Sequence, residues 1–149
     1  MYPLEFLVTF LDDFAAVVAL SDKMLTGFFV GWPTPPSPKV LSKLIRNSTY
    51  SIVAIDEAQD RCVGYVTALS DGILFGYVSS LEVLPEFQGQ GIGQDLVARM
   101  LKKLSNVYAV DIVCDPDVQP FYEKCGLRRC ASMVTRNPAQ IAKLNSGLD

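Results

Sequence analysis

The sequence predicts a single α/β (α+β) domain with a mixed, mostly antiparallel central sheet flanked by helices. Its 149 residues suit one domain, and half of them are apolar, which is enough for a substantial core. Strand-like and helix-like patterns succeed one another along the chain, as in sheets covered by helices. A β-rich run at residues 77–83 leads into a glycine-rich turn and then an amphipathic helical pattern from Ile92 to Leu104. No repeat divides the chain, so residues 1–149 are expected to form one domain.

The first third of the chain predicts one strand and two helices. An apolar run at residues 4–10 has β character, and Asp12 or Asp13 can cap a helix over residues 14–25. Leucine and isoleucine at helical spacing, with serines able to cap it, predict a second helix within residues 37–48.

A stiff loop separates these two helices. Residues 27–38 contain four prolines and two glycines, a composition that excludes regular structure. The loop also carries Phe28, Phe29 and Trp32. Two interpretations stay open: a rigid connector whose aromatic residues pack on the core, or one wall of a substrate site on which Phe29 and Trp32 contact an amine.

The rest of the chain predicts a series of strands interrupted by two helices. A nearly continuous apolar run at residues 107–114, holding the single charge of Asp111, is typical of a central strand covered on both faces. Around the next helix, Asp117 is a suitable N-cap and Gly126 a suitable residue after its end. In order, the predicted elements are strands at 50–55, 62–69 and 77–83, a helix from Ile92 to Leu104, a strand at 107–114, a two-turn helix near 118–125, a strand at 128–136 and a frayed helix within 137–149.

Composition and charge argue against several classes of function. The net charge is −3 and no basic run occurs, so nucleic acid is not an expected partner. The chain has no histidine, the commonest general base and zinc ligand, and no metal is expected. Four cysteines without a Cys-x-x-Cys pair suit a reducing cytoplasm. The apolar start is interrupted by two aspartates and resembles neither a signal peptide nor a membrane span.

The glycine-rich turn between the strand at 77–83 and the following helix predicts a diphosphate site. The first N–H groups of a helix lack partners within it and carry the positive end of its dipole. Glycines at the alternate positions 89, 91 and 93 let a bulky anion approach that backbone closely. The turn lacks the Gly-Lys-Ser/Thr of a Walker loop and the Gly-x-Gly-x-x-Gly of a dinucleotide fingerprint.

The pattern Gln88-Gly89-Gln90-Gly91-Ile92-Gly93 resembles motif A of the GNAT N-acetyltransferases, whose loop holds the pyrophosphate of acetyl-CoA. The order of predicted elements is similar to the GNAT fold, whose sheet splays between its fourth and fifth strands. The Pro120-Phe121-Tyr122 segment, followed by Gly126, is similar to the arylalkylamine N-acetyltransferase branch. The resemblance is specific over residues 83–127 and loose before Tyr50.

This resemblance implies a cofactor site for acetyl-CoA. The backbone of the strand would pair with the pantetheine arm as an added strand would. Phe121 would pack against the pantetheine or the core. The implied cofactor residues are Leu81, Val83, Gln88, Gly89, Gln90, Gly91, Ile92, Gly93, Gln94 and Phe121.

The same resemblance implies that Tyr122 is the acid that protonates the departing CoA sulfur, although a core tyrosine is the alternative. A phenol with a pKa of about 10 is protonated at neutral pH. The two histidines that relay the amine's proton in the arylalkylamine branch correspond to Tyr77 and Ser79, which leaves the base open. The nearby carboxylates are Glu82 and Asp111. Each is either the base or a structural acid, and a water chain ordered by Tyr77 and Ser79 is a further possibility.

Together these observations predict direct transfer of an acetyl group from acetyl-CoA to the primary amine of a small aryl- or alkylamine. Cys114 and Cys125 lack a histidine partner, which argues against a cysteine nucleophile. One alternative is acetylation of a protein N-terminus or lysine. Another is a non-catalytic module that binds acyl-CoA. A homodimer is expected by analogy alone.

Overall fold

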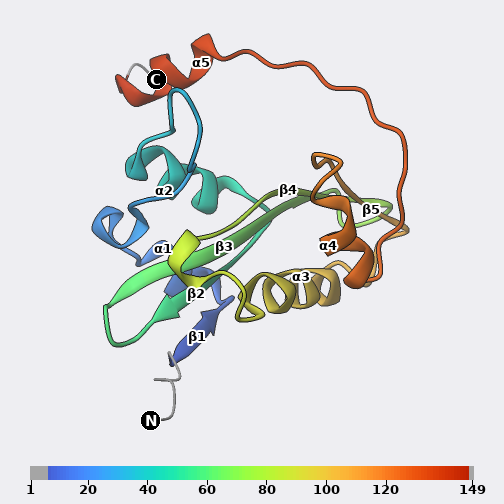
Figure 1. Cartoon of the computed structure of the whole chain (residues 1–149), viewed down its shortest axis with the longest axis horizontal. Helices are drawn as coiled ribbons and strands as arrows, with labels where there is room; N and C mark the ends of the chain where they lie inside the picture. The colour runs from blue at the N-terminus through green and yellow to red at the C-terminus, as the bar shows by residue number, and fades with distance from the viewer. Residues whose placement is uncertain (1–6, 148–149) are drawn as a thin grey trace.

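The computed structural model describes residues 7–147, and its centre is a five-stranded sheet in the order β1-β2-β3-β4-β5 (Figure 1). Neighbouring strands from β1 to β4 pair antiparallel, whereas β5 runs parallel to β4. The sheet is therefore mixed and mostly antiparallel, as predicted. The strands are β1 (Val8–Leu11), β2 (Tyr50–Asp56), β3 (Arg61–Ser70), β4 (Phe75–Val83) and β5 (Ala109–Ile112).

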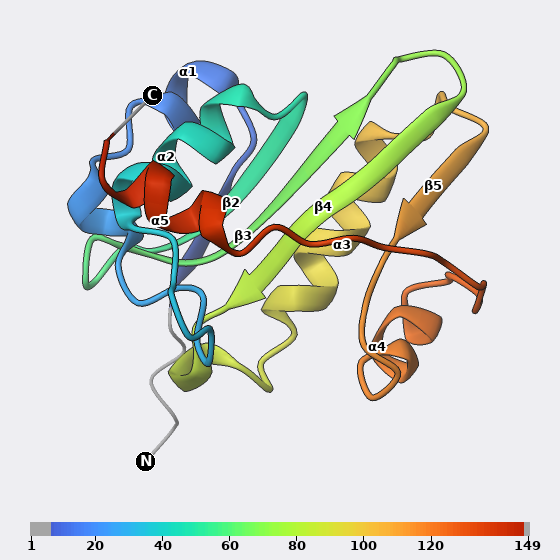
Figure 2. The ribbon, with the colours of Figure 1, turned by 90° about the horizontal axis from the view of Figure 1, so that it is seen from above.

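Helices cover both faces of this sheet. The side chains of Leu96 and Met100 on α3 are fully buried against one face. Leu41 and Ile45 on α2 are buried on the opposite face, over the β1 to β3 side (Figures 1 and 2). The helical elements are α1 (Phe14–Val18), η1 (Asp22–Leu25), α2 (Pro38–Asn47), η2 (Pro85–Phe87), α3 (Ile92–Lys103), α4 (Gln119–Lys124) and α5 (Ala139–Asn145).

The helix starts follow the local chemistry of the sequence. Asp13 accepts a hydrogen bond from the N–H of Ala16 and caps α1, and Ser37 accepts one from Val40 and caps α2. The chain leaves the helical conformation after Val18 and re-enters it as the separate 3-10 turn η1. The predicted single helix over residues 14–25 is therefore interrupted. Within residues 7–147, no helix is long and apolar enough to cross a bilayer.

A bulge in β4 and the short pairing of β5 together open the sheet. The β3–β4 register pairs Thr67 with Ser80 and Ala68 with Val78, so Ser79 is the extra residue of a bulge and has no residue opposite it in the register. Strand β5 pairs only with residues 75–78 of β4. Beyond Val78 the two parallel strands diverge. The second half of β4 thus has an edge that β5 does not fill, as the predicted splay requires.

The bulge also decides which side chains share a face of β4. A Cβ on Gly76 would lie 3.0 Å from Leu104, so residue 76 faces α3 and Tyr77 faces the other way. After the bulge, the side chain of Val83 lies near Gly93 on the α3 side, so Glu82 faces away from α3. Tyr77 and Glu82 therefore share the face away from α3 although their numbers differ by five.

Three predicted features differ from the structure. Residues 128–136 form no strand and are exposed, with Met133 completely so, because they pair with no strand and their alternation buries nothing. This segment instead leads to α5 (Figure 2). β5 is the last strand of the sheet rather than a central one, and Asp111 is exposed. Val118, not Asp117, occupies the N-cap position of α4.

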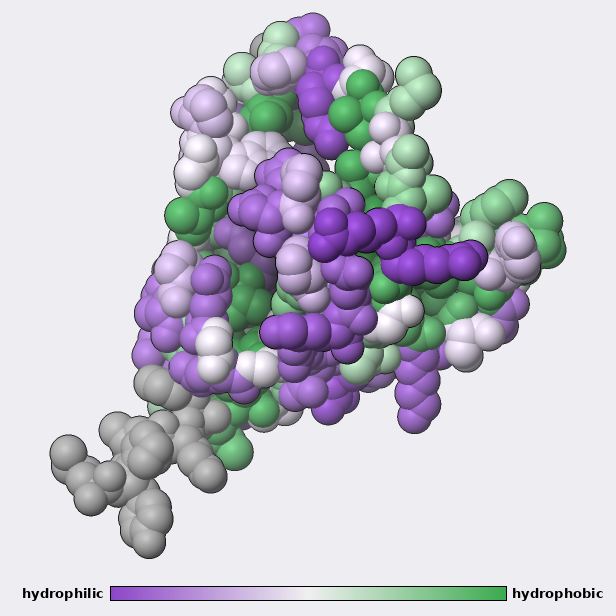
Figure 3. Space-filling model, turned by 45° about the vertical axis from the view of Figure 1, so that its right-hand side comes forward, coloured by the Kyte–Doolittle hydropathy of each residue, from purple (hydrophilic) through white to green (hydrophobic). Residues whose placement is uncertain are grey.

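The first predicted strand is found in part. β1 covers Val8–Leu11, and residues 4–6 lie outside the described part of the chain. The predicted helix near the C-terminus is confirmed over Ala139–Asn145. Hydrophobic side chains also reach the surface in patches between hydrophilic ones (Figure 3), and Leu69 and Phe75 on β3 and β4 are both about half exposed.

Candidate active site

The glycine turn after η2 has the backbone that an anion site requires. Gly89 and Gly91 have φ values of +79° and +87°, which side-chain-bearing residues rarely adopt, and a Cβ at either would meet no atom within 4 Å. The first bond of α3 runs from the N–H of Asp95 to the carbonyl of Gly91. The N–H groups of residues 92–94 precede that bond and have no acceptor in the helix. They lie at its positive end, next to the open space at Gly89 and Gly91.

Gly93 has a different role in the same turn. A Cβ there would lie 3.3 Å from the ring of Phe121, tighter than ordinary packing. Glycine at this position thus lets α4 approach the start of α3. Phe121 is therefore placed beside the turn, as the predicted cofactor set requires.

Gln88 is already engaged at the end of β4. Its N–H donates to the carbonyl of Pro85 at 3.3 Å, and its side-chain amide donates to the carbonyl of Val83 at 2.9 Å. Residues 88–93 were predicted to hold the pyrophosphate through their N–H groups, and for Gln88 this prediction is corrected, because its N–H is already bonded. Through its side-chain amide, Gln88 instead fastens the turn to the end of β4.

The second half of β4 offers free main-chain groups beside the turn. The N–H of Leu84 donates to the carbonyl of Val63 on β3 at 2.8 Å. Because backbone groups alternate along a strand, the N–H groups of Leu81 and Val83 point away from β3, toward the gap that β5 leaves. An extended ligand arm can pair with this edge as an added strand would.

A pocket of about 390 Å³, which we call the loop pocket, lies between β4 and the proline-rich loop. The aromatic residues predicted to contact the substrate and the strand residues predicted to contact the cofactor line the same space. The structure therefore brings these two predicted sets together. The lining residues are Phe29, Val30, Trp32, Ser80, Leu81, Glu82, Val83, Pro85 and Gln88.

Glu82 holds the loop rather than standing free in the pocket. Its carboxylate accepts hydrogen bonds from the N–H of Phe29 at 2.6 and 2.9 Å and from the N–H of Val30 at 3.4 Å. Phe29 has a φ of +61°, an uncommon conformation for a bulky residue that these bonds help to maintain. The oxygens that a base would offer to a proton are thus occupied by the loop.

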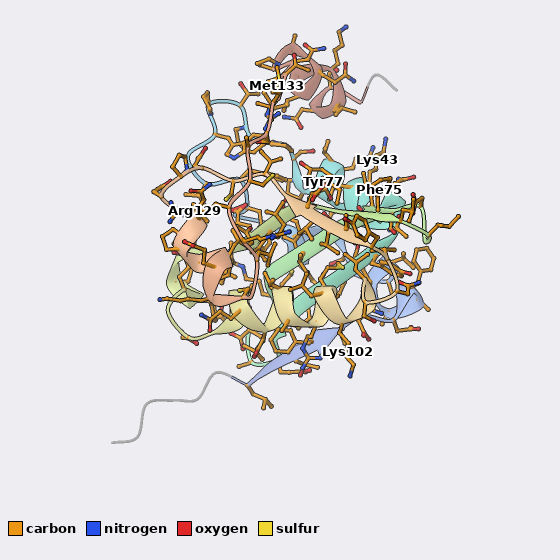
Figure 4. All side chains as sticks on the ribbon, turned by 90° about the vertical axis from the view of Figure 1, so that its right-hand side faces the viewer. Lys43, Phe75, Tyr77, Lys102, Arg129 and Met133 are labelled. Carbon is orange, nitrogen blue, oxygen red and sulfur yellow. The ribbon has the colours of Figure 1, made fainter. Side chains whose placement is uncertain are left out.

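A second pocket, the β5 pocket, has a volume of about 820 Å³ and lies between β5, α4 and the segment that follows α4. Tyr77 and Asp111, which are partners in the β4–β5 register, both line it, as does Tyr122. Figure 4 shows Tyr77 and Phe75 on the side of the sheet away from α3, which carries Lys102. Asp111 is exposed, so the apolar surroundings predicted for it are absent.

The surroundings of Tyr122 keep its phenol protonated. Burial, with smaller contributions from the neighbouring Cys114 and Cys125, raises its pKa to about 12. Its ring lies 5.0 Å from that of Phe121 in an edge-to-face arrangement. The short helix α4 thus directs one aromatic residue to the glycine turn and the next to the β5 pocket.

Ser79 and Ser80 at the bulge are tied to β3. The hydroxyl of Ser79 shares a hydrogen bond of 2.9 Å with Thr67, and that of Ser80 shares one of 2.8 Å with Tyr65. Tyr65 is fully buried, and its ring packs against Phe29 at 6.5 Å. Nothing in the sequence distinguishes Tyr65 as a site residue, because an aromatic residue in an apolar strand looks like any other core residue.

These arrangements suit a ligand with a diphosphate at one end and an extended arm. Free N–H groups at α3 would meet the diphosphate, and the free edge of β4 would meet the arm. A family model described as the acetyltransferase (GNAT) family matches residues 17–127, a span that includes both features. The chain belongs to the GNAT acetyltransferase family. Membership implies acetyl-CoA as the co-substrate, as predicted.

Solved structures and relatives agree with this assignment. The chain is 34% identical to a putative acetyltransferase from Deinococcus radiodurans R1, with a TM-score of 0.83 over 93% of this chain and 92% of that one. It is 30% identical to the uncharacterized N-acetyltransferase ycf52 of Porphyra purpurea over 65% of this chain and 58% of the relative. It is 34% identical to N-alpha-acetyltransferase 30 of Schizosaccharomyces pombe over 54% of this chain and 58% of the relative.

The chain therefore spans less than two thirds of these two curated relatives. The predicted GNAT fold and family are confirmed. The finer likeness to the arylalkylamine branch and the roles of individual residues remain predictions.

Proposed function

We propose that this GNAT protein transfers an acetyl group from acetyl-CoA directly to the primary amine of a small aryl- or alkylamine. The observation that carries the proposal is the junction at the end of β4. Free N–H groups of the glycine turn, the open strand edge and an aromatic-lined pocket follow one another there. An arm that leaves the turn along β4 would bring its thioester between the loop pocket and the β5 pocket that Tyr122 lines.

Different residues at that junction bind the pyrophosphate, the pantetheine and the amine. Ile92, Gly93 and Gln94 hold the pyrophosphate through their N–H groups, with Gly89, Gln90 and Gly91 shaping the approach. Leu81 and Val83 pair with the pantetheine, and Phe121 packs beside it. Phe29 and Trp32 contact the apolar part of the amine, since their rings lie edge to face at 5.2 Å beside the pocket.

The amine attacks the thioester carbon, the C–S bond breaks, and CoA leaves as a thiol. Tyr122 supplies the proton to the sulfur, because its raised pKa keeps the phenol protonated across the working range. Burial raises the thiol pKa values of Cys114 and Cys125 as well. Neither cysteine is activated as a thiolate, which supports direct transfer without an acyl-enzyme.

The amine must lose its proton before it attacks. Glu82 is occupied by the loop, so Asp111 with Tyr77 in the β5 pocket is the better proton acceptor, with water as the carrier. Ser79 lies at the bulge between the two pockets and can orient such a water.

Acetylation of a protein N-terminus is the second candidate, because N-alpha-acetyltransferase 30 is among the relatives. Acetylation of a lysine and a non-catalytic role in binding acyl-CoA are further alternatives. A cytoplasmic location and a homodimer are retained as proposals, and light scattering on the purified chain tests the dimer.

One experiment separates these functions. CoA release is measured with acetyl-CoA and four acceptors: 2-phenylethylamine, hexylamine, a peptide with a free N-terminus, and an N-acetylated peptide with one lysine. The proposal expects the highest kcat/KM with one of the small amines. A preference for either peptide would replace the acceptor class. Thermal stabilisation by acetyl-CoA without turnover of any acceptor would favour the binding module.

A further inference from the structure

The position of the proline-rich loop on the molecule depends on hydrogen bonds at its two ends. Pro33, Pro35 and Pro36 have no N–H group, so residues 33–36 offer carbonyls with few donors to match them. Hydrogen bonds with the rest of the molecule hold the two ends of the loop in place. Glu82 supplies them at one end, to Phe29 and Val30.

The other end of the loop is held by a residue more than a hundred positions later. The N–H of Ser37 donates to the side-chain carbonyl of Asn145 at 2.8 Å, and the side-chain amide of Asn145 donates to the carbonyl of Pro35 at 2.9 Å. An amide side chain offers both a donor and an acceptor, as this bridge requires. Asn145 is the last residue of α5, and α5 lies against α2 beyond the loop (Figure 2).

Trp32 lies between these two attachments. Its N–H donates to the carbonyl of Phe29 at 3.2 Å, and its ring is half exposed at the loop pocket. The conformation of residues 31–34 therefore depends on how firmly both ends are held. A change at either attachment is expected to move the tryptophan ring relative to the pocket.

We propose that Asn145 is a positioning residue for the acceptor, because its bridge from Pro35 to Ser37 keeps Trp32 at the wall of the loop pocket. The proposal rests on the proposed function in taking this pocket as the acceptor site. The proposal gives α5 a role in acceptor binding. The cofactor groups on α3 and β4 are separate from this bridge, so acetyl-CoA binding should not depend on it.

Trp32 is the single tryptophan in the sequence, so its fluorescence reports on the loop without any assay of activity. Asn145→Ala removes both bonds, and Gln140→Ala removes another exposed amide from the same helix. Ser37→Ala removes the side-chain cap of α2 but keeps the N–H that Asn145 accepts. It should lower the melting temperature without changing the emission of Trp32.

We expect Asn145→Ala to shift the Trp32 emission maximum and to raise KM for 2-phenylethylamine by about tenfold, since two hydrogen bonds are lost. KM for acetyl-CoA and the thermal shift that it produces should be unchanged. Gln140→Ala should match the parent protein in every measurement.

The outcomes separate the bridge from the proposed function. Unchanged Trp32 emission in Asn145→Ala would overturn the bridge, whatever the protein acetylates. A shifted emission with an unchanged KM for the amine would overturn the assignment of the loop to acceptor binding. If the parent protein does not acetylate 2-phenylethylamine, the proposed acceptor class fails, and the fluorescence still decides whether Asn145 positions the loop.

Discussion

Replacing Gly91 by alanine tests the anion site most directly. Residue 91 has a φ of +87°, and an added Cβ would meet no atom within 4 Å. The cost to folding is therefore backbone strain alone, about 1–2 kcal/mol. Relief of that strain would turn the N–H groups of Ile92 and Gly93 away from their present directions. Losing one charge-assisted hydrogen bond to the pyrophosphate costs about 1.5–3 kcal/mol, which raises the dissociation constant for acetyl-CoA about 10- to 150-fold.

Gly72 provides a matched control at the other end of β4. It has a φ of +73° in the β3–β4 connection, and a Cβ there would also meet nothing within 4 Å. Gly72→Ala should lose a similar amount of stability in urea denaturation and bind acetyl-CoA normally in calorimetry. Equal losses of stability in both variants with the same dissociation constant for acetyl-CoA would refute the anion site at the glycine turn.

Three further predictions concern Tyr122 and Glu82. Tyr122→Phe should lower kcat about 100-fold with little change in acetyl-CoA affinity; an unchanged kcat across pH would exclude the phenol as the acid. The pKa of Tyr122 in the folded protein, about 12, lies above the ordinary tyrosine pKa of 10.0, so the unfolded chain loses this proton first and stability should fall as pH rises between these values. That fall, followed by urea denaturation, should be shallower in Tyr122→Phe. Glu82→Gln should shift Trp32 emission and raise the KM for the amine more than it lowers kcat, because the amide cannot accept all the hydrogen bonds that the loop N–H groups donate to the carboxylate. A large loss of kcat with unchanged Trp32 emission would instead indicate that Glu82 is a base.

The local features of the cofactor site were predictable because they depend on neighbouring residues. A β-rich run, alternate glycines and a helical pattern occur within residues 77–104, and their conformations follow from backbone sterics and helix ends. The role of Gly93 could be predicted only in part from the sequence. Its close approach to Phe121 depends on α4, which lies far along the chain.

The acceptor side could not be predicted to the same depth. Glu82 was recognised as a candidate, but its bonds to Phe29 and Val30 join residues more than fifty positions apart. Asn145 carried no sequence signal, since a single asparagine in a polar tail resembles any surface residue. The prediction of a strand at 128–136 was wrong, because alternation specifies a strand only where another strand is available to pair with it.

The sequence by itself determined the family, the order of nearly all the elements and the glycine turn, because motif spacing and hydrophobic periodicity are local properties. Only the tertiary structure decided which side chains meet. The bulge at Ser79 shifts the alternation of β4 by one residue and turns Glu82 toward the loop. Asp111 is exposed on β5 at the edge of the sheet, and the short pairing of β5 leaves the edge of β4 open. Register and long-range contacts depend on how strands pair across the fold, and no stretch of neighbouring residues carries that information.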